Sequence, residues 1–391
     1  MDFNPKIHRN HNVYILGAGF SRDAGLPLIS DFLDQMRESV NWLEDKGRSR
    51  ELEAVNQVFH FRQQAAGSAY RARIDPENIE DLFSLASASK GAANDEYVST
   101  AIAATLDYSQ ANKKTMHYRG LVNSDFNLPT EWQNEGEANR KGKAYYRAPV
   151  HDIYGGILSG ALCESAPGMR NTVITFNYDT LLEKALQKWG VPFNYQLPMN
   201  GVSYDESALH IKANELNPDA MKILKLHGSI NWAIIRDSAS ESEFDLSIYS
   251  DYSGLVENNH SPYLLPPSWR KMFVNAQTTV WDAALEAITE ATRIIIIGFS
   301  MPPSDQHFKY LMAAGLRDNI SLRDVIFLSK DDGSGVVAKT LHENVSQIFH
   351  PIFCKKINWE MNGVQQVFAN EGFLRSIERK CTDVFGEIAC F

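Results

Sequence analysis

The sequence has little cysteine, no long apolar run and no excess of positive charge. Its four cysteines, Cys163, Cys354, Cys381 and Cys390, are too few and too scattered for a disulfide framework, and no pair is spaced C-x-x-C. This usage is typical of a reduced intracellular protein, so we expect a cytoplasmic location. No run approaches the ~18 apolar residues of a membrane span, and the start, MDFNPKIHRNHN, lacks the apolar core of a signal peptide.

The formal net charge is −10, which argues against non-specific binding to nucleic acid or to anionic membranes. The chain is 44% hydrophobic and 22% charged, a composition that is ordinary for a globular protein and excludes a disordered or collagen-like chain. Its 391 residues suffice for one large α/β domain with insertions, or for two domains.

Short apolar runs that end in glycine or polar residues are typical of buried parallel strands. They lie at 13–16, 172–176, 223–226, 294–297 and 325–328. Helical patterns alternate with them, near 281–288, near 308–316 and most clearly at 180–190. There Thr180 and Glu183 have capping-box spacing and Gly190 follows the last apolar residue. This alternation predicts an α/β fold with a doubly wound, Rossmann-like parallel sheet.

Two segments interrupt the alternation. The first, 41–149, is predicted to be a mostly helical insertion that ends in a polar loop at 108–143. One of its helices should begin at Asp75-Pro76 and bury the apolar side chains of Ile79, Leu82, Phe83 and Leu85. We therefore expect residues 1–40 and 150–391 to form the Rossmann domain and 41–149 a separate subdomain. The second, 237–269, has six acidic residues and no Lys or Arg, which favours a solvated hairpin or loop. At the end of the chain we expect a helix near 336–348, an edge strand near 352–357 and a helix near 364–384.

The first strand leads into GAGFSRDAGLP, from Gly17 to Pro27. Glycines between a strand and a helix can place backbone N–H groups around a phosphate. The run is not the dinucleotide fingerprint, whose third glycine would fall at Arg22, and no Gly-Lys-Ser/Thr follows it as in a P-loop. A tight strand–helix turn is the alternative interpretation.

Polar residues follow two further strands. Asn177 and Asp179 belong to TFNYD, and His227 belongs to LHGS. In open α/β sheets, ligands bind beyond the carboxyl ends of the strands. Asp179 could equally cap the next helix, and His227 could be a structural residue. Their occurrence together with the glycine loop favours a ligand site.

In order, GAGFSRDAGLP, TFNYD, KLHGS and IIIIGFS resemble the landmark motifs of the sirtuin family. The similarity is closest to bacterial sirtuin-like domains that degrade NAD in phage defence, and ENIEDLF and LLPPSWRK also resemble that branch. The resemblance implies a sirtuin-type fold with NAD as substrate. It assigns the pyrophosphate to Gly17, Ala18, Gly19 and Ser21, and the phosphate or adenosine side to Gly298 and Ser300. It implies that Asp179 binds the nicotinamide amide or its ribose, that Asn177 places a water or ribose hydroxyl, and that His227 accepts a proton.

Two departures from the deacylase pattern limit what the resemblance implies. Deacylases carry a zinc ribbon of two C-x-x-C pairs, and this chain has no such pair. They also have an aspartate, an aromatic residue and an arginine directly after the proline, whereas Pro27 is followed by LISDF. With the acyl-peptide half missing, water is the natural nucleophile. The prediction is an NAD+ hydrolase (NADase) that needs no metal, releases nicotinamide and linear or cyclic ADP-ribose, and depletes NAD in abortive infection.

Three alternatives stay open. The site could serve an ADP-ribosyltransferase or a deacylase, and the missing cysteines argue chiefly against the deacylase. The chain could be a non-catalytic NAD-binding subunit. A metal enzyme has little support, because His8 and His11 lie in a terminus expected to be mobile and no other His/Cys spacing fits. Because an unrestrained NADase would harm its own cell, we also expect a homo-oligomer gated by a partner, for which the resemblance suggests a HerA-type ring ATPase.

Overall fold

The computed structural model describes residues 10–69, 71, 74–88, 92–123, 127–137, 142–162, 164–165, 169–236, 244–265, 275–302, 305–331, 333–368 and 379–380. At its centre is a seven-stranded sheet with the order β15-β14-β13-β1-β6-β9-β7, in which every pair of neighbours is parallel. The strands are β1 (His11–Leu16), β6 (Arg170–Thr175), β7 (Phe193–Asn194), β9 (Met221–Lys225), β13 (Arg293–Ile297), β14 (Asp324–Leu328) and β15 (Ile357–Glu360). The predicted α/β fold with a parallel sheet is confirmed.

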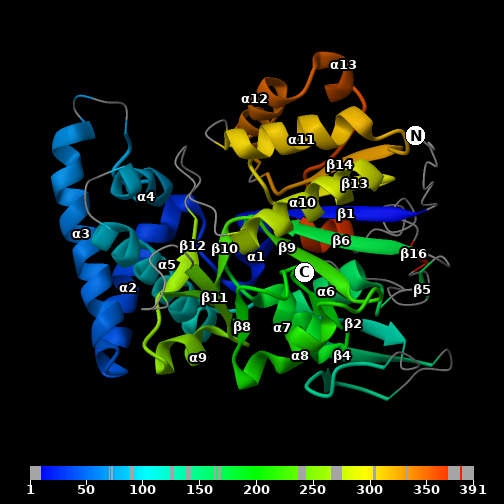
Figure 1. Ribbon diagram of the computed structural model, residues 1–391. Coiled ribbons are helices and arrows are strands. Elements are labelled where there is room, and N and C mark those ends of the chain that lie inside the picture. The colour runs from blue at the N-terminus through cyan, green and yellow to red at the C-terminus, as the bar shows by residue number, and fades with distance from the viewer. Residues whose placement is uncertain are drawn as a thin grey trace.

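Helices cover both faces of this sheet (Figure 1). Helices α10 (Asn275–Glu290) and α11 (Gln306–Asp318) pack together on one face, and α6 (Val150–Ser159) and α7 (Leu181–Lys188) pack together on the other. Every residue of β1 and β13 is buried, as the apolar runs 13–16 and 294–297 predict for strands covered on both sides. The predicted helices near 281–288, 308–316 and 336–348 correspond to α10, α11 and α12 (Val336–Ile348).

A second buried core lies beyond the carboxyl ends of the central strands (Figure 1). It is built from α2 (Phe32–Asp45), α3 (Ser49–Ala69), α4 (Ile79–Ala88) and α5 (Ala92–Asn112), here called the helical unit. A four-stranded sheet with the order β12-β10-β11-β8 packs against it. Its strands are β8 (Val202–Tyr204), β10 (Gly228–Arg236), β11 (Phe244–Ile248) and β12 (Pro262–Leu264). The expected subdomain boundary at residue 41 falls inside α2, a helix that packs against α3 and α5.

The prediction of a polar loop at 108–143 is wrong for the described residues. Helix α5 continues to Asn112, and β2 (His117–Asn123) pairs antiparallel with β4 (Lys143–Pro149), to which β3 (Gln133–Asn134) adds a third strand. Tyr118 and Val122, both on β2, are buried, and so is Trp132, which packs edge-on against Trp189 at 5.2 Å. The few apolar residues of this polar segment therefore suffice to anchor a sheet on the central core.

The expectation of a solvated segment at 237–269 is also wrong where the structure describes it. The hairpin exists, because β10 and β11 pair antiparallel, but Leu246 and Ile248 are buried. Helix α9 (Tyr252–Glu257) follows and buries Tyr252 and Leu255 in the core of the helical unit. Acidic side chains and buried apolar side chains are interspersed here, so the charge of the segment does not predict its burial. Residues 237–243 and 266–269 lie outside the described part.

Several local expectations also need correction. Helix α4 begins at Ile79 rather than at Asp75-Pro76, because Asp75 Oδ1 accepts the Glu77 N–H in a turn that precedes the helix. Leu85 is only half-buried, and Ala86 takes the fourth buried position. The edge strand expected at 352–357 is instead α13 (Pro351–Cys354) followed by β15.

The last predicted helix, near 364–384, is confirmed only as α14 (Val364–Phe368). Within the predicted segment 364–384, residues 379–380 form β16 (Arg379–Lys380), which pairs with β5 (Glu164–Ser165). Residues 369–378 and 381–384 lie outside the described part. His11 is not in a mobile terminus: it is fully buried in β1, with Nε2 2.9 Å from Thr172 Oγ1. His8 lies outside the described residues. Among the described helices, we find none that is both long enough and apolar enough to span a bilayer.

Candidate functional site

Four neighbouring strands of the central sheet, β13, β1, β6 and β9, end at one edge. The loops that follow them carry all the candidate site residues predicted from the sequence. The chain order of the strands reverses between β1 and β13, which is the switch point where open α/β sheets form ligand crevices. The described structure therefore brings the glycine loop, the Asn-Tyr-Asp turn, the His-Gly turn and the loop after β13 to one place.

The glycine loop lies directly against the loop after β13. The backbone N–H of Gly17 donates to Ile297 O at 3.0 Å, and that of Gly19 donates to Gly298 O at 2.8 Å. Gly298 has φ +61°, and a Cβ there would lie 2.3 Å from the Phe20 nitrogen. Only glycine permits this approach, so the contact explains why both loops need glycine.

These hydrogen bonds use N–H groups that were expected to face a phosphate. In this structure the Gly17 and Gly19 N–H groups donate to the neighbouring loop. Ala18 is exposed at the start of the short helix α1 (Ala18–Ser21), and Ser300 is exposed beyond β13. The Ser300 carbonyl accepts the Asn344 side-chain N–H at 2.8 Å, which ties this loop to α12.

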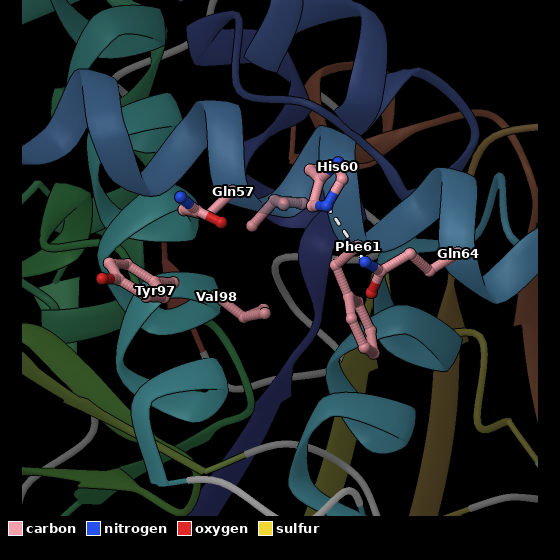
Figure 2. A pocket seen from close by; sticks show the side chains of 7 residues that line it. Gln57, His60, Phe61, Gln64, Tyr97 and Val98 are labelled. Atoms are coloured by element: carbon pink, nitrogen blue, oxygen red, sulfur yellow. Dashed lines mark hydrogen bonds between the residues drawn. The ribbon is translucent and has the colours of Figure 1, made fainter.

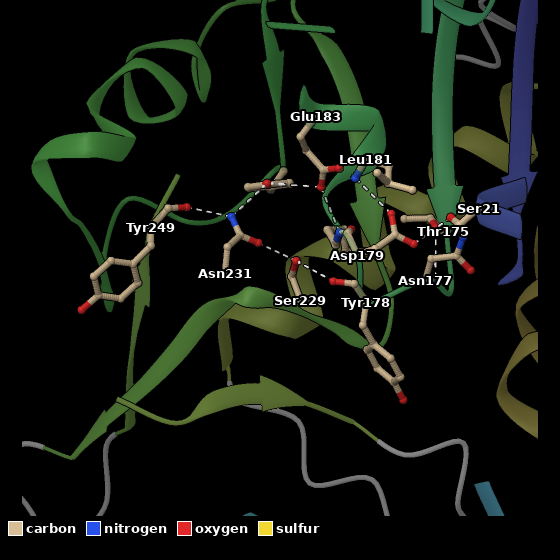
Figure 3. A network of polar contacts seen from close by, with 12 residues as sticks. Ser21, Thr175, Asn177, Tyr178, Asp179, Leu181, Glu183, Ser229, Asn231 and Tyr249 are labelled. Atoms are coloured by element: carbon tan, nitrogen blue, oxygen red, sulfur yellow. Dashed lines mark hydrogen bonds and ion pairs between the residues drawn. The ribbon is translucent and has the colours of Figure 1, made fainter. Parts of the chain in front are cut away.

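Asn177 joins the glycine loop to the turn after β6 (Figure 3). Its Nδ2 donates to Gly17 O at 2.9 Å and to Ser21 Oγ at 3.1 Å, while Ser21 Oγ donates to Asp179 Oδ2 at 2.7 Å. Gly17 O can only accept, which fixes the orientation of the Asn177 carboxamide. Both amide hydrogens are thus committed to the glycine loop, and Oδ1 is the acceptor that the side chain can present to a ligand.

The start of helix α7 differs from the predicted capping box. Thr180 Oγ1 has no hydrogen-bond partner, and Glu183 does not reach back to the cap. Asp179 instead holds the first turn, because its Oδ1 accepts the Leu181 N–H at 3.0 Å. Asp179 therefore precedes the N-cap residue Thr180 and supports the first turn of α7 without being its N-cap, while its second carboxylate oxygen accepts from Ser21 Oγ.

A buried ion pair supports this turn. Lys225, at the end of β9, is 1% exposed, and its Nζ donates to Glu183 Oε1 at 2.9 Å and to the Asp179 carbonyl oxygen. Tyr195 OH donates to the same Glu183 oxygen at 3.3 Å. A buried charge requires such partners, and this pair joins the end of β9 to the first turn of α7.

His227 follows β9 directly and is 5% exposed. Its ring packs edge-on against Phe176 at 5.0 Å, and Nε2 lies 3.6 Å from Asp305 Oδ2. The next residue, Gly228, has φ +79°, and a Cβ there would lie 2.2 Å from Tyr263 O. His227 thus lies at the end of β9, against the residue that precedes Asn177.

A second histidine lies beneath the glycine loop. His151, on α6, is buried with Nε2 3.0 Å from the Phe20 carbonyl oxygen, while its Nδ1 has no partner. Burial lowers the pKa of His151 against the opposing effects of Asp179 and Asp23. The ring is thus held neutral, and Nε2–H can donate to Phe20 O.

Sequence reasoning missed Asp305, Lys225 and His151 as parts of this site. Asp305 could have been found only as a helix cap, since it precedes α11 and its Oδ1 accepts the Phe308 N–H at 3.1 Å. Lys225 was visible as a lysine inside a buried strand pattern, which signals a buried ion pair. Nothing local in the sequence marks His151.

A pocket elsewhere, between α3 and α5, has a volume of about 50 Å³ (Figure 2). It is lined by Gln57, Val58, His60, Phe61, Gln64, Tyr97 and Val98. Ligand pockets usually measure roughly 300–1,000 Å³, so this one is too small for a dinucleotide. Within the described ranges we find no group of three or more His, Cys, Asp or Glu side chains arranged to hold a metal ion.

Comparison with known proteins agrees with the motifs. The model of the SIR2-like domain matches residues 171–348. No curated protein matches the chain. Similar solved structures include a mutant Sir2 homologue with ADP-ribose, at 12% identity and TM-score 0.36, covering 94% of this chain and 91% of that one. They also include a Sir2 homologue with NAD, at 13% identity and TM-score 0.34, covering 94% and 89%. Over residues 171–348, the chain thus matches the SIR2-like domain that its sequence motifs resemble.

Proposed function

We propose that the protein is an NAD+ glycohydrolase, which uses water to cleave the bond between nicotinamide and ribose. The observation that carries the proposal is that Asn177 and Asp179 hydrogen-bond to the glycine loop, while His227 follows the neighbouring strand β9 and packs against Phe176, the residue before Asn177. The match to the SIR2-like domain supports NAD as the substrate.

In this proposal the substrate lies across the switch point. The pyrophosphate would lie at the exposed Ala18, because the Gly17 and Gly19 N–H groups donate to Ile297 O and Gly298 O. The adenosine side would lie toward Gly298 and Ser300, and the nicotinamide riboside toward Asn177 and His227. Contacts with neutral groups of this kind need no cationic side chain, so the net charge of −10 does not oppose binding.

The bond that breaks joins ribose C1′ to the nicotinamide nitrogen, and its electron pair leaves with the ring, which becomes neutral. A water oxygen bonds to C1′, and the proton that it loses passes to His227. Because Nδ2 of Asn177 is held by Gly17 O and Ser21 Oγ, its Oδ1 is oriented to accept from that water or from a ribose hydroxyl. The transition state resembles an oxocarbenium ion, so catalysis depends mainly on positioning and electrostatics.

Nicotinamide release from NAD by the purified protein tests the proposal. We expect turnover without added metal or protein acceptor, and persistence of activity in chelator. A requirement for an acyl-lysine peptide would favour a deacylase, and transfer of label from NAD to protein would favour a transferase. Asn177→Ala and His227→Ala should each reduce turnover by at least ~100-fold in folded protein. His210→Ala, which changes an exposed histidine, is the matched control; wild-type turnover in either site variant would remove that residue from the mechanism.

The proposed biological role is depletion of NAD in the cytoplasm during phage infection. Such activity needs a gate, and we propose a homo-oligomer switched by a HerA-type ring ATPase. The resemblance of the motifs to defence effectors supports this role. Mass measurement of the protein alone and with a neighbouring ATPase, alongside NAD turnover, tests it. A fully active monomer would exclude this gate.

A further inference from the structure

His227 has an acidic neighbour that the proposed mechanism does not use. Asp305 is 3% exposed, and its two carboxylate oxygens face different groups. Oδ1 accepts the Phe308 N–H and so begins α11, while Oδ2 lies 3.6 Å from His227 Nε2. The backbone N–H of Asp305 donates to Pro302 O at 3.0 Å. The carboxylate is therefore fixed by the helix that it caps, and it is placed to pair with His227 when the ring carries a proton.

The helical unit contributes a second carboxyl group, that of Glu80, within reach of the charge of Asp305. Glu80 is half-buried in the first turn of α4, between Ile79 and Leu82–Phe83, which are buried in the core of the helical unit. Tyr178 packs against that core, and its ring lies 6.4 Å from the ring of His227. The Tyr178 hydroxyl donates to Leu265 O at 2.9 Å, so the phenol is held between the two units.

Charge interactions connect these groups. Burial, followed by repulsion from Asp305 and Asp81, raises the pKa of Glu80 to about 7. Burial, followed by the charges of Glu80 and Asp305, raises the pKa of Tyr178 well above its ordinary range. Among the described residues, no cation pairs with the Glu80 carboxylate. Its charge therefore changes near neutral pH, at the edge of the site that holds His227.

We propose that Asp305, fixed by the helix that it caps, is the positioning residue of His227. Negative charge at this carboxyl group favours the protonated imidazole. The catalytic consequence rests on the proposed NAD hydrolysis, whereas the electrostatic coupling does not.

The test uses Asp305→Asn and Glu80→Gln in the full chain. Asparagine caps helices as well as aspartate does, so the first change removes the charge and leaves the start of α11 intact. Glu53→Gln, at an exposed position of α3, is the control. Circular dichroism verifies folding, and the NMR signals of the His227 ring report its titration directly.

We expect the His227 titration midpoint to fall by about one pH unit or more in Asp305→Asn, because a paired negative charge is lost. It should fall less in Glu80→Gln and stay unchanged in the control. In NAD turnover, the acid limb of the pH profile should move with the midpoint. Asp305→Asn should lower kcat about 10-fold or more with little change in KM.

An unchanged His227 midpoint in Asp305→Asn overturns the inference, whatever the turnover shows. Absence of NAD turnover in the wild type, both alone and with the partner ATPase, would contradict the proposed function instead, and the NMR titration would still decide whether Asp305 acts on His227. A loss of kcat in Asp305→Asn that leaves the pH profile in place would mean that Asp305 does not act through His227.

Discussion

The ionisation of Glu80 makes stability depend on pH in a way that one substitution can isolate. Burial and the nearby carboxylates of Asp305 and Asp81 raise its pKa from 4.5 to about 7. The folded protein therefore holds a proton on Glu80 between these two pH values, while the unfolded chain does not. Stability from this group is fully present below pH 4.5 and is lost as the pH rises through about 7.

The size of the effect follows from the same two values. Each pKa unit corresponds to about 1.4 kcal/mol, so the charged carboxylate of Glu80 costs the folded state about 3 kcal/mol relative to the neutral acid. Glutamine has the same shape and cannot ionise. Glu80→Gln should therefore match the wild type in free energy of unfolding near pH 4.5 and exceed it by up to about 3 kcal/mol at pH 8.5.

Denaturant titrations of both proteins at several pH values between 4.5 and 8.5 measure this difference. Glu53→Gln, which replaces an exposed carboxylate of the same helical unit, serves as the control and should differ little from the wild type at any pH. A difference between Glu80→Gln and the wild type that stays constant with pH would refute the reasoning, because a packing change does not titrate.

Three further predictions concern the supports of the site. Lys225→Met should destabilise the fold by about 3–5 kcal/mol by leaving Glu183 buried and unpaired, and Lys225→Met/Glu183→Leu should recover most of that loss in the same denaturation assay. His151 has a lowered pKa, so the wild type should lose stability as the pH falls below 6.5, whereas His151→Gln should not; equal slopes would contradict the burial of a neutral ring. Gly298→Ala should destabilise by more than about 1 kcal/mol, since φ is +61° and its Cβ would meet the Phe20 nitrogen; a neutral result by thermal unfolding would mean that the two loops separate freely.

The corrections follow from what local patterns contain. The segments 108–143 and 237–269 are polar on average, yet each places a few apolar side chains at alternate positions, and Val122 and Leu246 reach a core that a distant part of the chain provides. At the start of α7 the sequence offers Thr180 with Glu183 as a capping box. Glu183 instead pairs with the buried Lys225, because an unpaired buried ammonium group would cost the fold much more free energy than a lost helix cap.

The sequence by itself determined the α/β class, the alternation of strands and helices, and the residues Asn177, Asp179 and His227 at strand ends, because apolar periodicity and glycine turns are local signals. The tertiary structure alone decided the surroundings of those residues. It commits the Gly19 N–H to Gly298 O and sets Asp305 against His227, and it places Glu80 among their charges. The physical reason is that strand order and loop packing join segments far apart in the chain, and the partners of a buried polar group are known only once those segments meet.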